Sequence, residues 1–226
     1  MIKAIVFDLD DTLYSEKDFV YGAFEIVSEF IANNKNLESK FIFEQMIKTL
    51  DTHGRGKIFD IVCDENSIDI PIDDLVEVYR NSKPKISLFN ESLEILIFLK
   101  KQGYKVGIIT DGISIVQWNK IKQLDIEAYV DNVIVTGDFG DGFSKPNTKS
   151  FIEMAKLFNL KPDEIIYVGD NPNKDFIGAR EVGYKTVQIK NKYSEYGDLQ
   201  LDKNYEADYI IYNLLDLMLV LQEIKN

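Results

Sequence analysis

Residues Ile2–Leu13 have the sequence IKAIVFDLDDTL, and this stretch decides the fold. The segment Ile2–Phe7 is short, mostly apolar and rich in β-branched residues, which predicts a buried strand. The acidic residues Asp8, Asp10 and Asp11 follow at once, so the strand ends in a polar loop. We therefore expect a strand that carries carboxylates at its end.

The next stretch, from about Glu16 to Ser82, changes to helical periodicity. Apolar residues recur three and four positions apart, for example at Phe19, Ala23 and Val27. No convincing strand pattern interrupts them. We expect residues 16–83 to form an all-helical insertion, and residues 1–15 and 84–226 to form one α/β domain.

Beyond Pro84, strand and helix patterns alternate, which indicates βαβ units and a doubly wound parallel sheet. We expect Asn90 to cap the first helix, and Gly183 to end the fourth. The expected strands are Tyr104–Ile109, Asn132–Thr136, Glu164–Val168, Tyr184–Ile189 and Tyr209–Ile211. The expected helices are Asn90–Lys101, Ser114–Leu124, one around Phe151–Phe158, Lys174–Val182 and Leu214–Ile224. The polar stretch Asn191–Glu206 is expected to be a surface loop.

Composition excludes several classes of protein. The chain has 226 residues, with 26 basic and 38 acidic side chains and a net charge of −12, which disfavours nucleic acid and anionic membranes as partners. Cys63 is the single cysteine and cannot form an intramolecular disulfide. No apolar run is long enough for a membrane span, and the N-terminus lacks the regions of a signal peptide. We expect a cytoplasmic protein.

Four predicted strand ends carry polar residues. In parallel α/β sheets, ligands bind beyond the carboxyl ends of the strands, so we expect these residues to converge. They are Asp8-Leu9-Asp10, Thr110-Asp111-Gly112, the loop leading to Ser144-Lys145-Pro146, and Gly169-Asp170.

The carboxylates of Asp8, Asp10 and Asp170 would repel one another at such an edge unless a cation lay between them. Oxygen ligands with incomplete protein coordination suit Mg²⁺, which also binds phosphate. One carboxylate could then attack phosphorus, and a second could act as general acid and base. The alternative is a solvated acidic turn.

Other residues at these strand ends fit a phosphoryl group. The Thr110 hydroxyl and the backbone amides of Asp111 and Gly112 can hold phosphoryl oxygens, although Thr110 could instead cap the following helix. Lys145 can offset the negative charge, or it is one of many surface lysines. Asp175 can support the metal ligands from the next helix turn.

In chain order, these residues resemble the haloacid dehalogenase-like superfamily. The matching segments are Phe7-Asp8-Leu9-Asp10-Asp11-Thr12-Leu13, Ile109-Thr110-Asp111-Gly112, Lys145-Pro146, and Val168-Gly169-Asp170 with Asp175. The resemblance implies a Rossmann-like core. It also implies that the insertion at residues 16–83 is a helical cap, which closes over the site and selects the substrate.

The resemblance also implies roles for the acidic residues. Asp8 would be the nucleophile and Asp10 the general acid and base. Mg²⁺ would be held by Asp8, the backbone carbonyl of Asp10, and Asp170, with Asp175 in support. An Asp-x-Asp pair favours phosphoryl transfer over dehalogenation, because a halide leaves without a proton.

By the same resemblance, Thr110 and Lys145 would bind the phosphoryl group, together with the backbone at Asp111 and Gly112. Asp111 stands where many relatives carry Asn, which adds a carboxylate near the phosphate. We expect its backbone NH to bind phosphate while its side chain points away or toward the cap.

The function implied is Mg²⁺-dependent hydrolysis of a small phosphomonoester through an aspartyl-phosphate. A sugar phosphomutase and a non-catalytic metal-binding regulatory module are the alternatives. The expected partner is a small phosphorylated metabolite, without nucleic acid or membrane, and relatives suggest a monomer or a homodimer.

Within the insertion, Thr52–Lys57 contains two glycines and three side chains that can be cationic. Arg55 is our candidate substrate-binding residue there; the alternative is an exposed turn between helices. His53 is the only histidine, so a histidine-rich metal site is excluded.

Overall fold

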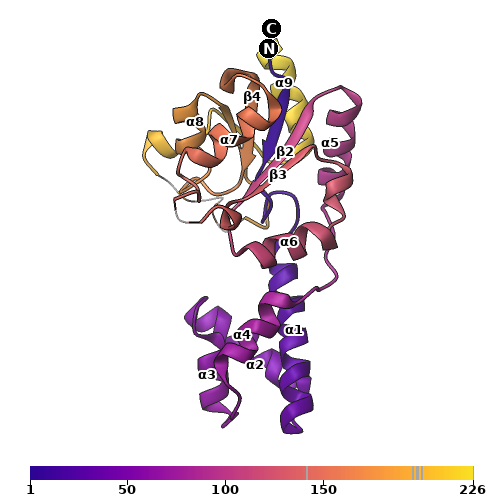
Figure 1. Ribbon diagram of the computed structural model, residues 1–226, viewed down its shortest axis with the longest axis vertical. Coiled ribbons are helices and arrows are strands. Elements are labelled where there is room, and N and C mark those ends of the chain that lie inside the picture. The colour runs from indigo at the N-terminus through magenta and orange to yellow at the C-terminus, as the bar shows by residue number, and fades with distance from the viewer. Residues whose placement is uncertain (141, 195, 197–198, 200, 226) are drawn as a thin grey trace. The chain divides into compact units, whose positions relative to one another are not determined.

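Strand β1 (Ala4–Phe7) is fully buried, as its apolar β-branched sequence predicts. In the computed structural model it lies between β2 (Lys105–Thr110) and β4 (Ile165–Gly169), and it pairs in parallel with both. Figure 1 shows β1 in indigo between these neighbours. The structure describes residues 1–140, 142–194, 196, 199 and 201–225.

The six described strands form one parallel sheet in the order β3-β2-β1-β4-β5-β6. The remaining strands are β3 (Asn132–Val135), β5 (Lys185–Ile189) and β6 (Tyr209–Ile211). From β1 the chain adds β2 and β3 on one side of the sheet, and it then adds β4, β5 and β6 on the other side. The strand order therefore reverses between β1 and β4. The predicted doubly wound parallel sheet is confirmed.

Helices cover the sheet because alternate side chains on each strand point to opposite faces. One face carries Ala4 and Val6 and packs against α7 (Lys149–Phe158) and α8 (Ile177–Val182). Helix α7 buries residues Phe151, Met154, Ala155 and Phe158, which recur at helical spacing. Helix α5 (Asn90–Lys101) contacts β2, and it also contacts the turn at Leu214–Asp216 that leads into α9 (Leu217–Lys225).

Most strand bounds differ from the sequence prediction by one or two residues, and three helix N-termini differ in their start or cap. Phe89, not Asn90, is the N-cap of α5, and it has no capping side chain. Helix α8 begins at Ile177 because residues 171–175 close a turn of their own, in which Asp175 accepts a hydrogen bond from the backbone NH of Asn171. The C-terminal helix begins with a 3₁₀ turn before α9. Gly183 does end α8, with a φ of 107° that favours glycine.

The chain divides into two compact units, Met1–Ser15 with Ser87–Asn226, and Glu16–Ile86. The second unit contains α1 (Glu16–Lys35), α2 (Ser39–His53), α3 (Ile58–Glu65) and α4 (Ile72–Asn81), and no strand. Its core is formed by apolar side chains that are fully or nearly fully buried, among them Val27, Ile42 and Leu75. The predicted helical insertion after the first strand is confirmed.

The polar stretch predicted as a surface loop, Asn191–Glu206, lies partly outside the described residues. Its described part includes a 3₁₀ turn at Lys203–Tyr205. None of the described helices combines the length and the apolar character needed to span a bilayer.

Candidate active site

The polar strand ends meet beside the point where the strand order reverses. Phe7 pairs with Ile108 on one side and with Val168 on the other, so Asp8 emerges between the ends of β2 and β4. The backbone NH of Asp8 donates to the carbonyl of Val168 at 2.8 Å. Parallel pairing thereby brings Asp8 and Asp170 together although 161 residues separate them in sequence.

Three buried carboxylates form the centre of the site. Asp8, Asp170 and Asp175 each offer an oxygen, and these oxygens all lie within 4.8 Å of one another. Their exposed fractions are 2%, 2% and 0%. Gly169 makes room for this arrangement, since a Cβ at that position would collide with the Asp175 carboxylate.

Lys145 balances part of this negative charge. Its Nζ lies 2.8 Å from Asp8 Oδ1 and 2.8 Å from Asp175 Oδ1, and it also donates to the Tyr167 hydroxyl at 2.8 Å. Burial alone would lower the pKa of Lys145, but the charges of Asp175 and Asp8 outweigh it and hold that pKa well above its usual value. The ammonium is therefore fixed and charged.

Among the three carboxylates, Asp170 is the one whose negative charge is offset least by a neighbouring positive charge. Burial, followed by the negative charges of Asp175 and Asp8, raises its pKa to about 8. A divalent cation among the three carboxylates would remove this penalty, and hard oxygen donors are the ligands that Mg²⁺ prefers. The residues present therefore fit a metal site of this kind.

Asp10 lies outside the group of three and has its own partners. Its carboxylate accepts hydrogen bonds from the Tyr14 hydroxyl at 2.5 Å, Lys120 Nζ at 2.7 Å and Gln117 Nε2 at 2.9 Å. Burial raises its pKa, but the Lys120 charge and these hydrogen bonds outweigh burial, so the pKa of Asp10 falls below its usual value. The group of three carboxylates therefore includes Asp175, which was expected to support the metal ligands, and does not include the Asp10 carboxylate. Metal binding by the Asp10 backbone carbonyl stays a prediction.

The residues at the end of β2 connect neighbouring loops. Thr110 is fully buried, and its hydroxyl oxygen lies 2.5 Å from Gln117 Nε2. The Asp111 carboxylate accepts from the Lys145 backbone NH at 3.1 Å and from the Thr136 hydroxyl at 2.9 Å. The Asp111 side chain therefore fastens the loop that carries Lys145, and phosphate binding by the Asp111 backbone NH stays a prediction.

The segment Lys145–Pro146 precedes α7 without starting it. The helix begins at Lys149, three residues after Pro146. Gly112, next to Asp111, has a φ of 145°, which glycine tolerates best.

Several residues of the site escaped sequence reasoning. Gln117 and Lys120 lie on α6 (Ser114–Gln123), are almost fully buried, and both reach Asp10. Two long polar side chains three residues apart on the otherwise buried face of a helix are a signal that could have identified them. Tyr167 gave no such signal, because an aromatic residue in a central strand is usually part of the core.

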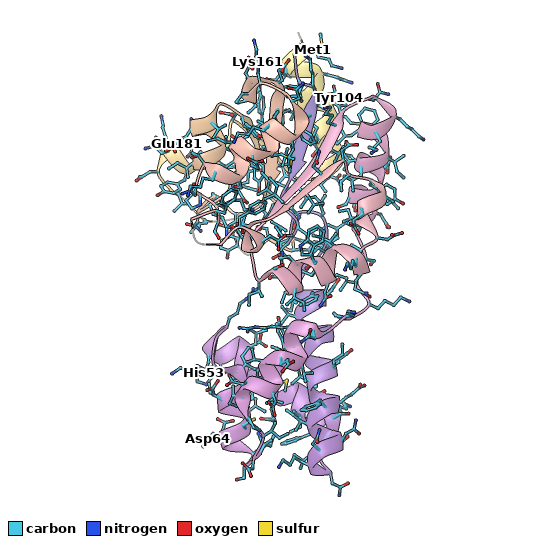
Figure 2. The ribbon with its side chains drawn as sticks, viewed as in Figure 1. Met1, His53, Asp64, Tyr104, Lys161 and Glu181 are labelled. Atoms are coloured by element: carbon cyan, nitrogen blue, oxygen red, sulfur yellow. The ribbon has the colours of Figure 1, made fainter. Side chains whose placement is uncertain are left out.

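Arg55 and His53 belong to the helical unit. Arg55 Nη2 lies 2.6 Å from Glu16 Oε2, and its side chain is 56% exposed. It borders a cavity of about 220 Å³ whose lining includes the rings of Phe59 and Tyr79. His53 is the last residue of α2 and is exposed (Figure 2). A role of Arg55 in substrate binding stays a prediction.

The chain is similar to known phosphatases over most of its length. A family described as "Haloacid dehalogenase-like hydrolase" matches residues 5–189. Glyceraldehyde 3-phosphate phosphatases of Methanocaldococcus jannaschii and Pyrococcus furiosus are 34% and 33% identical, and the alignments cover 100% and 98% of this chain and 99% and 93% of those proteins. The crystal structure of a HAD phosphatase from Thermococcus onnurineus superposes with a TM-score of 0.65 at 26% identity, covering 97% of this chain and 98% of that one. With its buried aspartates at the reversal point of the sheet, the chain belongs to the haloacid dehalogenase-like hydrolases, in their phosphatase branch.

Proposed function

We propose that the protein is a Mg²⁺-dependent phosphatase that hydrolyses a small phosphomonoester through an aspartyl-phosphate on Asp8. The observation that carries this proposal is the environment of Asp8. Its carboxylate is buried at a strand end, paired with Lys145 and adjacent to Asp170 and Asp175. Burial raises the pKa of Asp8 although Lys145 opposes that rise, so the carboxylate is poorly solvated and suited to attack.

In the first step, an Asp8 carboxylate oxygen forms a bond to phosphorus as the bond from phosphorus to the ester oxygen breaks. Asp10 gives its proton to that leaving oxygen. In the second step, Asp10 takes a proton from water, whose oxygen attacks phosphorus and releases phosphate and free Asp8. A bound Mg²⁺ would supply charge neutralisation for the phosphoryl oxygens.

The contacts of Asp10 suit the second step directly. Lys120 and the hydrogen bonds from Tyr14 and Gln117 favour its ionised form, which is the form that accepts a proton. For the first step Asp10 must carry a proton. The dianionic phosphate of a substrate raises the pKa of a nearby carboxyl and so favours that form.

Phosphoryl binding is assigned to Thr110, Lys145 and the backbone amides of Asp111 and Gly112. Lys145 brings a fixed positive charge, and Asp111 holds the loop of Lys145 in place. We assign residues 16–83 as the cap that selects the substrate, with Arg55 as a candidate contact. Because two relatives are named glyceraldehyde 3-phosphate phosphatases, this triose phosphate is the first substrate to test.

The test is phosphate release from a panel of esters with added Mg²⁺ and with EDTA. The panel holds glyceraldehyde 3-phosphate, phosphoglycolate, hexose phosphates, nucleoside monophosphates and p-nitrophenyl phosphate. We expect Mg²⁺-dependent release, with the highest kcat/KM for the triose phosphate. Isomerised sugar phosphate without free phosphate would instead indicate a mutase, and no turnover of any ester would indicate a regulatory module.

A further inference from the structure

Asp170 is held by one residue in β5 and one that follows β5, both distant in sequence from Asp170 itself. The Ser194 hydroxyl donates to Asp170 Oδ2 at 2.9 Å, and Gln188 Nε2 donates to the Asp170 backbone carbonyl at 3.3 Å. Within the described parts of the chain, Asp170 forms no salt bridge, whereas Asp8 and Asp175 share Lys145. Ser194 therefore makes the side-chain contact that orients the least compensated carboxylate.

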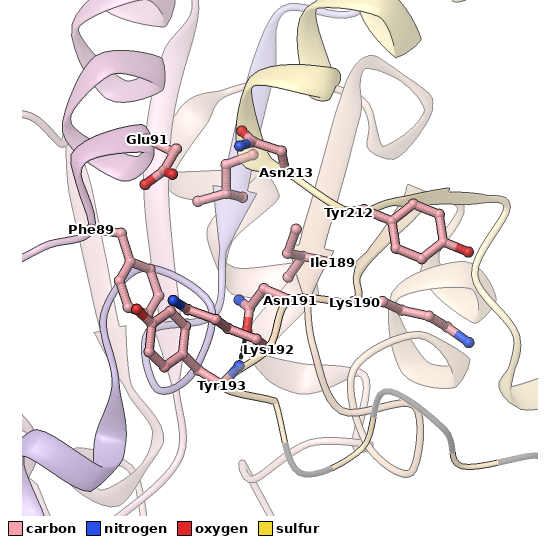
Figure 3. Close-up of a pocket in the computed structure, with 10 residues that line it drawn as sticks. Phe89, Glu91, Ile189, Lys190, Asn191, Lys192, Tyr193, Tyr212 and Asn213 are labelled. Carbon is pink, nitrogen blue, oxygen red and sulfur yellow. Dashed lines mark hydrogen bonds between the residues drawn. The ribbon is translucent and has the colours of Figure 1, made fainter.

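The segment Asn191–Ser194, which we call the clasp, is built to hold that serine. Asn191 Oδ1 accepts from the backbone NH groups of Tyr193 at 2.8 Å and Ser194 at 3.0 Å. Asn191 Nδ2 donates to the backbone carbonyl of Asp11 at 2.9 Å. The Tyr193 ring stacks on Phe89 with centroids 4.5 Å apart, at one wall of a cavity of about 290 Å³ (Figure 3). The clasp is thus fastened to the acidic loop after β1 as well as to Asp170.

The Ser194 hydroxyl has a defined direction. Its oxygen accepts from the backbone NH of Tyr196 at 3.1 Å, which occupies one lone pair. In the ionised form that would bind a metal, the Asp170 carboxylate only accepts hydrogen bonds, so the single hydroxyl hydrogen of Ser194 points to Asp170 Oδ2. Asp170 also contributes one carboxylate oxygen to the group of ligand atoms shared with Asp8 and Asp175.

We propose that Ser194 is a positioning residue for the metal ligand Asp170. Three buried carboxylates repel one another, and the one without an ammonium partner would rotate away unless it were held. Hydrogen bonds to ligating carboxylates commonly set metal affinity in this way. This inference rests on the proposed function, because it assumes that the three carboxylates bind Mg²⁺.

The test is Mg²⁺ binding by isothermal titration calorimetry to the full-length protein without substrate. We expect Ser194→Ala to weaken Mg²⁺ binding by about 10–100-fold. Ser194→Thr retains the hydroxyl and should restore affinity. Ser87→Ala, at an exposed serine of the same unit, should bind as the wild type does, and Asp170→Asn should bind no Mg²⁺.

The outcomes separate the inference from the function it rests on. If the wild type binds Mg²⁺ and Ser194→Ala binds it equally well, the positioning role is wrong while the metal site stands. If the wild type binds no Mg²⁺, both the metal site and the positioning role are wrong. In assays of Ser194→Ala, kcat should recover at saturating Mg²⁺, whereas a merely structural defect would lower kcat at every Mg²⁺ concentration.

A double-mutant cycle tests whether the clasp acts as one unit. Asn191→Ala removes the hydrogen bonds that shape the segment and should weaken Mg²⁺ binding in the same direction. If both residues act through Asp170, the double variant Asn191→Ala with Ser194→Ala should lose less affinity than the two single losses combined. Fully additive losses would show that Asn191 does not act through Ser194.

Discussion

The two units of the protein differ most in what they bury. In the α/β unit, six charged side chains among the described residues are buried, and all of them belong to the site or adjoin it. In the helical unit, residues 16–86, the buried polar side chains are only Ser28, Thr49 and Ser82. The six buried charges of the α/β unit are Asp8, Asp11, Lys120, Lys145, Asp170 and Asp175.

This difference follows from the cost of burying charge. An ionised group inside a protein is unfavourable unless it is paired, and even a well-paired group contributes little net stability. The helical unit avoids that cost and is built on apolar packing, with rings such as Phe24, Phe59 and Tyr79 in edge or tilted contact. In the α/β unit, the buried charges gather at the carboxyl ends of the central strands, where we propose that catalysis takes place.

The largest expected effect comes from the nucleophile. Asp8→Asn should reduce kcat on the order of 10⁴-fold or more, because an amide does not attack phosphorus. Its thermal stability should stay the same or rise, since the change removes a buried negative charge and Lys145 keeps its contact with Asp175. Turnover and Tm should be measured on the same preparations, with Asp163→Asn at an exposed position as the control. Wild-type turnover by uncontaminated Asp8→Asn would exclude covalent catalysis through this residue.

The second-largest loss of kcat is expected at Asp10, the proposed general acid and base. Asp10→Asn should slow the hydrolysis of alkyl phosphates by about 10²–10⁴-fold. The loss should be smaller for p-nitrophenyl phosphate, because its leaving group departs without a proton. The measurement is kcat across esters of graded leaving-group pKa. An equal loss for all leaving groups would contradict the role of Asp10 as general acid.

A change in the apolar core of the helical unit should affect stability rather than chemistry. Leu75→Ala removes a fully buried side chain and should cost about 2–5 kcal/mol of unfolding free energy. Below its melting temperature, kcat for p-nitrophenyl phosphate should remain near the wild-type value. Leu37→Ala, at a residue that is 38% exposed, serves as the control and should change stability little. If Leu75→Ala lowered kcat as strongly as a change at the aspartates, the contrast between the two units would fail.

The smallest effect is expected at Arg55. Its ion pair with Glu16 is partly exposed, so Arg55→Ala should change unfolding free energy by less than about 1 kcal/mol. If Arg55 contacts the substrate, KM for the true substrate should rise several-fold while p-nitrophenyl phosphate is hydrolysed as before. Lys40→Ala, at an exposed lysine of the same unit, controls for the loss of one positive charge. Unchanged KM for the true substrate would remove Arg55 from the site.

Much of the fold could be predicted because its signals are local. Apolar β-branched runs identify β1 and β4, and helical spacing identifies α7, since burial on both faces of a parallel sheet demands such patterns. The sequence pattern did not predict helix boundaries that depend on side-chain hydrogen bonds, such as the start of α8. The turn at residues 171–175 delays α8 because Asp175 binds the backbone NH of Asn171, and no propensity encodes that contact.

The sequence by itself determined that Asp8, Thr110 and Asp170 lie at strand ends and that Lys145 lies in a loop between a strand and a helix. Motif spacing and strand patterns are properties of neighbouring residues, so they can be recognised without the fold. Only the tertiary structure decided which partner each of these charged groups contacts. It pairs Asp10 with Lys120, brings Asp175 beside Asp8, and places the Ser194 hydroxyl against Asp170. These contacts join side chains from different loops, and their distances follow from the strand order and from the packing of α6 and the clasp. A linear pattern can show which groups are available, but electrostatic partners are set by proximity in space.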